Sequence, residues 1–143
     1  MNLITITDNV ATVAASISGI RGATGQEPDS IPMTPYVVVG LPKALVIPGD
    51  RTVTTMDLPM YVLIERLSGA QRDLRIAYGF VPTFVTTFAV NQSLSGTVQD
   101  ATITGWDTNT EYTIAGATYW AVEFTLTVGL HEHVPQKLDP SDP

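Results

Sequence analysis

The chain has 143 residues, a formal net charge of −7 and no cysteine. Its length suits a single domain, and the lack of cysteine excludes disulfides, thiolate metal sites and cysteine nucleophiles. The negative charge argues against tight nucleic-acid binding, because such binding requires basic residues that replace phosphate counterions. We expect one domain over residues 1–134 and a polar, proline-rich tail over residues 135–143.

The first predicted element is a helix over residues 7–17. Asp8 is a suitable N-cap for it, because its carboxylate can accept hydrogen bonds from the free N–H groups of the first turn. The residues that follow, 19–35, are rich in glycine and proline and predict a loop. Apolar residues recur in the helix at three- and four-residue spacing, namely Val10, Val13, Ala14 and Ile17.

Two strands and a hairpin are predicted next. Residues 35–42 indicate a buried strand bracketed by prolines. Residues 43–55 contain a turn at 48–50 with hydrophobic residues on both sides, which predicts a hairpin arm. Residues 58–65 predict a further strand. One face of that strand carries Leu58, Met60, Val62 and Ile64.

The hydrophobic period changes to a three–four spacing over residues 67–91, which predicts a long helix. Ser68 and Gln71 form a candidate capping box at its start. Pro82 has no N–H, and its ring collides with the carbonyl four residues earlier, so the helix should kink or restart there. Gly79 favours a break at the same place.

Three strands in a meander are predicted over residues 97–106, 111–116 and 117–128, with turns at 107–110 and 115–116. The last strand alternates strictly between two faces. We expect one face to lie under the helices, and it carries Trp120, Val122, Phe124, Leu126 and Val128. The order of elements predicts an α+β fold, a single antiparallel sheet, mixed at its edge, with two or three helices packed on one face.

The sequence contains no recognisable catalytic site, metal site or cofactor motif. His131 and His133 point the same way on an extended chain, but a zinc site needs a third ligand and no cysteine is available for it. The carboxylates are scattered over different elements, and the chain has no nucleophile elbow, phosphate loop or dinucleotide fingerprint. We therefore expect a protein that is not an enzyme and takes no cofactor.

Three basic residues lie close together around the start of the second helix, namely Arg66, Arg72 and Arg75. They are candidates for contact with phosphate or an acidic partner, and the alternative is a solvated helix face balanced by nearby acids. Aromatic residues on the strands leave a similar choice between a sugar-binding platform and ordinary cross-strand packing, which is the default. These residues are Trp106, Tyr112, Tyr119 and Trp120.

The order of elements and several stretches of sequence resemble a known family. A starting helix is followed by "TPYVVVG", a hairpin and "MYVLIERLSG", then by a helix with "FVPTFVTTFAVNQSLSGTV", and finally by "ITGW…YTIAGATYWAVEFTLTV". This pattern resembles the tail terminator proteins of long-tailed bacteriophages and the related head–tail joining proteins. The helix that ends in a polar turn of the "NQSLSG" kind, and the aromatic pair of "GATYW", carry the resemblance, which covers roughly residues 5–130.

The resemblance implies a virion protein that forms a ring, commonly a hexamer, at the head-proximal end of the tail. Such a ring contacts the tail tube protein and the neck or connector protein, and DNA passes through it only as cargo. A neck or head-completion connector and a minor tail protein are alternatives, and a small-ligand-binding β domain is less favoured. No apolar run in the chain approaches the roughly 20 residues of a membrane span, and the N-terminus does not read as a secretory signal, so we expect assembly in the host cytoplasm.

The hairpin arm supplies the predicted contacts between subunits. A hairpin that leaves its own domain has too little core to cover its apolar side chains, so a neighbouring subunit should cover them. The alternative is that the arm folds back on its own sheet. The candidate interface residues are Leu45, Val46, Ile47, Asp50, Arg51 and Val53.

Overall fold

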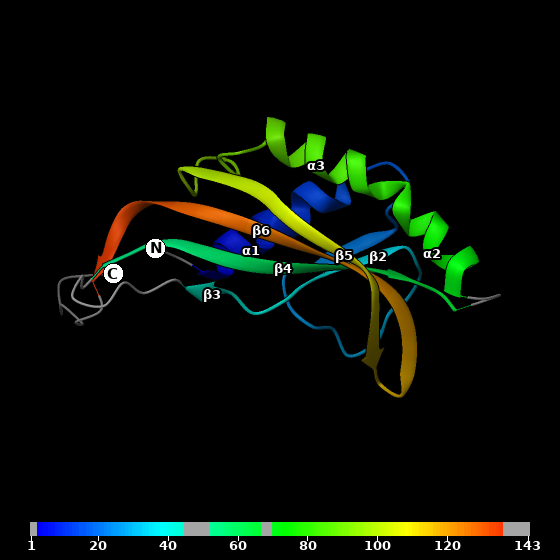
Figure 1. Ribbon diagram of the computed structural model, residues 1–143. Helices are drawn as coiled ribbons and strands as arrows, with labels where there is room; N and C mark the ends of the chain where they lie inside the picture. Colours follow the sequence, from blue (N-terminus) through cyan, green and yellow to red (C-terminus); the bar gives the residue numbers. More distant parts are fainter. Residues whose placement is uncertain (1–2, 45–51, 67–69, 136–143) are drawn as a thin grey trace.

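A computed structural model describes residues 3–44, 52–66 and 70–135 of the chain. One helix precedes a first group of strands, and two further helices separate that group from the last two strands (Figure 1). The elements in chain order are α1 (Leu3–Ala15), β1 (Gly22–Thr24), β2 (Tyr36–Val39), β3 (Lys43–Ala44), β4 (Thr52–Ile64), α2 (Ala70–Tyr78), α3 (Phe80–Val90), β5 (Asp100–Ile114) and β6 (Ala117–Pro135).

The strands form one six-stranded sheet in the order β1-β2-β4-β6-β5, with β3 paired to β4 beside β2. All pairs are antiparallel except β1 with β2, which run parallel at the edge of the sheet. The predicted α+β class and the single sheet with a mixed edge are therefore confirmed. In Figure 1, α1 and α3 lie on the same side of this sheet, and the β5–β6 hairpin curls away from them.

Helix α1 begins at Leu3, four residues before the predicted start. Asp8 therefore lies inside the helix, and its prediction as an N-cap is wrong. Threonines fit this longer helix because their hydroxyls bond back to the preceding turn, as Thr7 Oγ1 does to the carbonyl of Leu3 at 3.0 Å. The face turned toward the sheet carries the predicted spacing and consists of Ile6, Thr7, Val10, Ala11 and Ala14.

The segment predicted as a loop, 19–35, contains the short strand β1. Gly22, Ala23 and Thr24 pair in parallel with the first three residues of β2. Three residues are too few to show a sequence period, which is why glycine and proline content alone predicted a loop here. The buried strand predicted over 35–42 is confirmed as β2.

Strands β4 and β6 form the centre of the sheet. Their facing residues include Leu58 with Leu126, and Met60 with Phe124, and all four side chains are buried. The faces predicted for 58–65 and 117–128 are therefore confirmed. Strand β3 pairs antiparallel with β4, which agrees with the hairpin predicted over 43–55. The prediction that this hairpin is separate from the strand over 58–65 is wrong, because β4 is one strand from Thr52 to Ile64. The predicted turn at 48–50 lies outside the described residues.

Strand β5 is also longer than predicted. It runs without a turn through residues 107–110, so the predicted turn there is wrong. The register against β6 instead shifts between Ile103 and Gly105 and again between Asp107 and Thr110, and such bulges absorb extra residues within a continuous strand. The turn at Ala115–Gly116 is confirmed, with φ of 52° and 82°.

The long predicted helix is divided into α2 and α3 as expected, but the division lies at Gly79 and not at Pro82. Gly79 itself keeps right-handed helical dihedrals, φ −63° and ψ −22°, so the direction of the helix faces carries across the break. Pro82 is the third residue of α3, where the missing N–H would have no partner within the helix. The candidate capping residue Ser68 lies outside the described residues.

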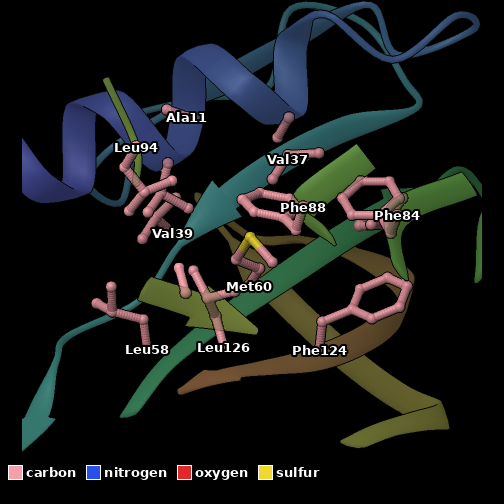
Figure 2. Packing of buried hydrophobic residues seen from close by; sticks show 14 of the residues in the cluster. Ala11, Val37, Val39, Leu58, Met60, Phe84, Phe88, Leu94, Phe124 and Leu126 are labelled. Atoms are coloured by element: carbon pink, nitrogen blue, oxygen red, sulfur yellow. The ribbon is translucent and has the colours of Figure 1, made fainter. Parts of the chain in front are cut away.

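The main core lies between the helices and the sheet (Figure 2). Phe84 of α3 stacks on Phe124 of β6, with ring centroids 4.7 Å apart, and also contacts Phe88 at 6.3 Å. Leu94, just after α3, is fully buried in the same cluster although its φ is 46°. The Asn9 side-chain amide donates to the Leu94 carbonyl at 3.1 Å, which joins α1 to this turn.

A smaller cluster lies on the other face of the sheet. Its buried members are Val38, Leu63, Ile114 and Ala121, and partly buried tyrosines surround them. Ile31 also packs against this cluster, so the segment that connects β1 to β2 covers part of the face that the main core does not use.

Candidate functional site

The predicted interface residues lie at the limit of what the structure describes. Residues 45–51, which include Leu45, Val46, Ile47, Asp50 and Arg51, lie outside the described part. Val53 belongs to β4, but its side chain also lies outside the described part. The backbone of His131 and His133 belongs to β6, and their side chains are likewise not described. The arm therefore stays a prediction.

Arg66 lies against an aromatic ring. Its guanidinium carbon is 4.6 Å from the centroid of the Trp120 ring, a cation–π contact. Trp120 in turn donates its indole N–H to Asp73 Oδ2 of α2 at 3.2 Å, and Asp73 is buried. Trp120, predicted to lie under the helices, is only partly buried and links the end of β4 to α2.

The structure describes the side chain of only one of the other two arginines. Arg75 is exposed on α2, and the side chain of Arg72 lies outside the described part. Of the three basic residues predicted to act together, the structure thus places Arg66 on Trp120 and leaves Arg75 on the helix surface. Their role as phosphate contacts stays a prediction.

The aromatic residues considered as a platform divide between two faces of the sheet. Tyr112 and Tyr119 pack against the smaller cluster, whereas Trp120 packs against the main core. Trp106 pairs with Phe124 across β5 and β6, yet its side chain is 56% exposed. These four residues therefore do not form one surface, and packing explains all of them except Trp106.

A groove of about 690 Å³ lies on the described surface. Its walls come from the start of α1, the residues after β1, the connection from β2 to β3, and residues of β4 and β5. Gly40 shapes one wall, because its N–H donates to the Pro59 carbonyl at 2.7 Å. A Cβ at Gly40 would lie 2.7 Å from Pro59 Cγ, so only glycine allows the chain to pass this close.

Several of the exposed residues that line the groove are apolar. Leu41 is 88% exposed and Ile4 is 73% exposed, and Leu3 lies beside Ile4 on the first turn of α1. Leu41 and Ile4 belong to segments far apart in the chain but line the same groove. Single exposed apolar residues are common on protein surfaces, whereas these three line one groove together.

Two tyrosines that contact each other line the groove. The rings of Tyr61 and Tyr112 lie 4.8 Å apart at a tilt of 48°, and Ala121 packs in the same cluster. The Tyr112 hydroxyl donates to Glu27 Oε1 at 3.2 Å, which ties the residues after β1 to β5. Burial, and then the charge and hydrogen bond of Glu27, raises the pKa of Tyr112 to about 12. Burial and then Glu123 raise the pKa of Tyr61.

The charge of the groove is negative. Asp8 and Glu27 line it and both are exposed, and no Lys, Arg or His occurs among the described lining residues. The groove therefore favours an apolar ligand or segment that carries a positive charge. Its titratable groups among the described residues are these two carboxylates and the two tyrosines.

Sequence reasoning missed this groove. Its residues come from five segments, and no local period or motif joins them. Two features of the sequence could have indicated the groove. One is Leu41, an apolar residue between Gly40 and Pro42, and the other is the apolar start of α1, which lies before the predicted start of the helix. Most of these segments meet because β1, β2 and β4 are neighbours in the sheet and α1 packs against β1 and β2.

Further features of the described residues bear on the class of protein. No cluster of three or more His, Asp or Glu side chains suited to a metal ion occurs among them. No helix in the described part has both the length and the apolar character that crossing a membrane requires. Comparison of the chain with models of protein families and with curated proteins found no match.

Proposed function

We propose that the chain is a structural protein of a bacteriophage virion, a tail terminator whose copies form a ring that caps the tail tube and joins it to the neck. The main support is that the stretches that carry the resemblance pack on one another. Phe84 before the "NQSLSG" turn, Leu94 within it and Phe124 after "GATYW" share one core. The resemblance therefore concerns one folded unit rather than scattered segments.

Exposed apolar surface supports a role in assembly. Leu41, Ile4 and Trp106 are each more than half exposed, and Leu41 and Ile4 line the same groove. Exposed apolar residues that gather in one place are typical of surfaces that contact other proteins. In this proposal the helices form one layer on a single face of the sheet, and the remaining surface contacts other subunits. The partners are other copies, in a hexamer, together with the tail tube protein and the neck protein. The protein is not an enzyme, takes no cofactor, and is located at the head-proximal end of the tail.

The experiment that tests this proposal removes the protein from assembling phage. A nonsense codon in the coding sequence should give tails without a finished head-proximal end, and these tails should not join heads. Supplying the chain in trans should restore joined particles, counted by negative-stain electron microscopy. Normal infectious particles without the protein would overturn the proposal.

Two alternatives differ in where the protein is found. A neck or head-completion connector should copurify with filled heads that lack tails, and a terminator with tails that lack heads. A minor tail protein should label the side or far end of the tail. The groove with Tyr61 and Tyr112 favours a third candidate, a small-ligand-binding domain, which should be a monomer that purified tails do not contain.

A further inference from the structure

A second exposed surface lies on the helices, away from the groove residues. Buried residues of α2 and α3, among them Leu74, Phe84 and Phe88, face the core. One position further along the chain, every member of a three–four–three–four series is exposed. This series, the helix stripe, consists of Arg75, Tyr78, Pro82, Val85 and Ala89. Because Gly79 keeps helical dihedrals, the stripe runs along one side of the joined helices.

We propose that the helix stripe of one copy docks into the groove of the next copy. This inference rests on the proposed ring, and it names the two surfaces that would form the contact between subunits. The groove is here defined by its rim residues Leu3, Ile4, Asp8, Glu27 and Leu41. An amphipathic helix laid into an apolar groove is a recurring mode of recognition between proteins.

The charges of the two surfaces are complementary. Asp8 and Glu27 give the groove a negative rim, whereas the helix stripe begins with Arg75 and Arg72 precedes it by one turn in the sequence. The whole chain contains only seven Lys and Arg residues against fourteen Asp and Glu. A basic start to an otherwise apolar stripe is therefore unusual for this chain, and it matches the acidic rim.

The apolar parts of the two surfaces also match. Leu41 and Ile4 on the groove rim are 88% and 73% exposed, and Tyr78 and Val85 on the stripe are 43% and 39% exposed. Docking would remove all four side chains from water, and each Å² of apolar surface removed contributes about 25 cal/mol. All four side chains are at least partly exposed in the single copy.

The geometry of this contact determines the symmetry of the oligomer that forms. The groove and the stripe are different surfaces of one chain, so their contact is heterologous and each copy keeps one free groove and one free stripe. Contacts of this kind build a closed ring when the rotation between copies closes, and not a symmetric dimer. A second copy is therefore an occupant that fits both the chemistry of the groove and the proposed ring.

The test uses one charged substitution on each surface of the full chain. Leu41→Glu places a carboxylate on the acidic rim, and Val85→Glu places one in the middle of the stripe. Both side chains are exposed, so neither change empties the core. In sedimentation velocity we expect the wild-type chain to form rings and each variant to remain a monomer. Met33→Glu and Val90→Glu are matched controls at exposed positions off the two surfaces, and they should still form rings.

Mixing the two defective variants gives the sharpest result. A Leu41→Glu copy retains an intact stripe and a Val85→Glu copy retains an intact groove, so an equimolar mixture should form a complex of two copies and stop there. A mixture that contains only monomers would overturn the inference. Assembly that survives either single variant, or a wild-type chain that stays monomeric at every concentration tested, would overturn it as well.

A charge exchange tests the polar part of the contact. Asp8→Lys and Arg75→Glu should each weaken assembly at low salt, and the double variant should recover most of the loss, because the pair is restored with its signs reversed. Asp29→Lys changes the charge by the same amount outside the groove and should have little effect. No recovery in the double variant would contradict the predicted pairing.

Failure of this inference and failure of the proposed function are distinguishable. If Leu41→Glu and Val85→Glu still complete tails in the complementation experiment, the docking surfaces are wrong and the virion role stands. If the wild-type chain itself does not complete tails, the proposed function fails, whatever the surfaces do in solution.

Discussion

At the scale of single residues, Phe124 should contribute more to stability than its neighbours. Its ring stacks on Phe84 at 4.7 Å and is fully buried. Phe124→Ala should lower the free energy of unfolding by about 3–5 kcal/mol, since it removes a buried ring and leaves a cavity. Urea denaturation checks this. Thr125→Ala, on the opposite face of the same strand, should cost much less, and equal losses in the two variants would contradict the assigned faces.

Tyr112 offers a second prediction at this scale. Its pKa of about 12 has burial as the first cause and Glu27 as the second. Glu27→Gln should therefore lower the pKa of Tyr112 while leaving it above 10.0, its ordinary value, because burial remains. Tyrosinate absorbance measured against pH checks this, with Asp29→Asn as the control and Tyr112→Phe to assign the signal. No shift with Glu27→Gln would mean that Tyr112 and Glu27 are not in contact.

The same shift makes stability depend on pH. A folded-state pKa raised above the unfolded value means that the folded state holds the Tyr112 proton more tightly. Its contribution is thus complete below pH 10 and is lost as the pH rises from 10 through about 12. Tyr112→Phe should flatten that part of the stability curve.

At the scale of elements, the β5–β6 hairpin turn can be improved. Ala115 and Gly116 both have positive φ, as a type I′ turn requires, but alanine in this region is strained. Ala115→Asn should raise the free energy of unfolding by about 0.5–1 kcal/mol, because asparagine tolerates these dihedrals and Asn-Gly suits this turn. Thermal unfolding checks the change. Ala117→Asn, one residue into the strand, should give no gain.

The elements also show what local sequence can and cannot predict. The faces of β4 and β6 were predictable because a two-residue period is local, as in Val122, Phe124 and Leu126. The lengths of the strands were not, because residues 107–110 carry a local turn signal that pairing with β6 overrides through bulges. The start of α1 was not predictable for a related reason, because the residues before Asp8 are largely β-branched and such residues have a low helix propensity. Resemblance, and not periodicity, suggested the assembly role.

The groove could not be predicted from local sequence either. Ile4 and Leu41 are 37 positions apart, and they meet only because β2 and its extension lie beside α1 in the folded sheet. Neither residue carries a signal of its own, since each is an apolar side chain in an apolar or proline-bounded stretch. Sites assembled by topology are not visible in a single sequence unless a chemical motif marks them.

At the scale of the whole molecule, the charge balance predicts weak binding to DNA. Seven basic residues face fourteen acidic ones, and Arg66 already lies on Trp120. Non-specific binding draws its free energy from counterion release by clustered Lys and Arg, and typical dissociation constants are about 10⁻⁴ to 10⁻⁶ M at physiological salt. We expect this chain to bind random duplex DNA more weakly than about 10⁻⁴ M under the same conditions, as a channel through which DNA must slide requires.

Fluorescence anisotropy with a labelled random duplex measures this affinity, and a charge variant shows whether the arginines matter. The double variant Arg66→Gln, Arg75→Gln should bind DNA as weakly as the wild-type chain. The double variant Asp8→Lys, Asp29→Lys should bind DNA more tightly and with a stronger dependence on salt, because two phosphate contacts become available. Submicromolar binding by the wild-type chain, lost in the arginine variant, would contradict the passive channel. It would instead make Arg66 and Arg75 phosphate contacts, and DNA would then be held by the ring rather than passed through it.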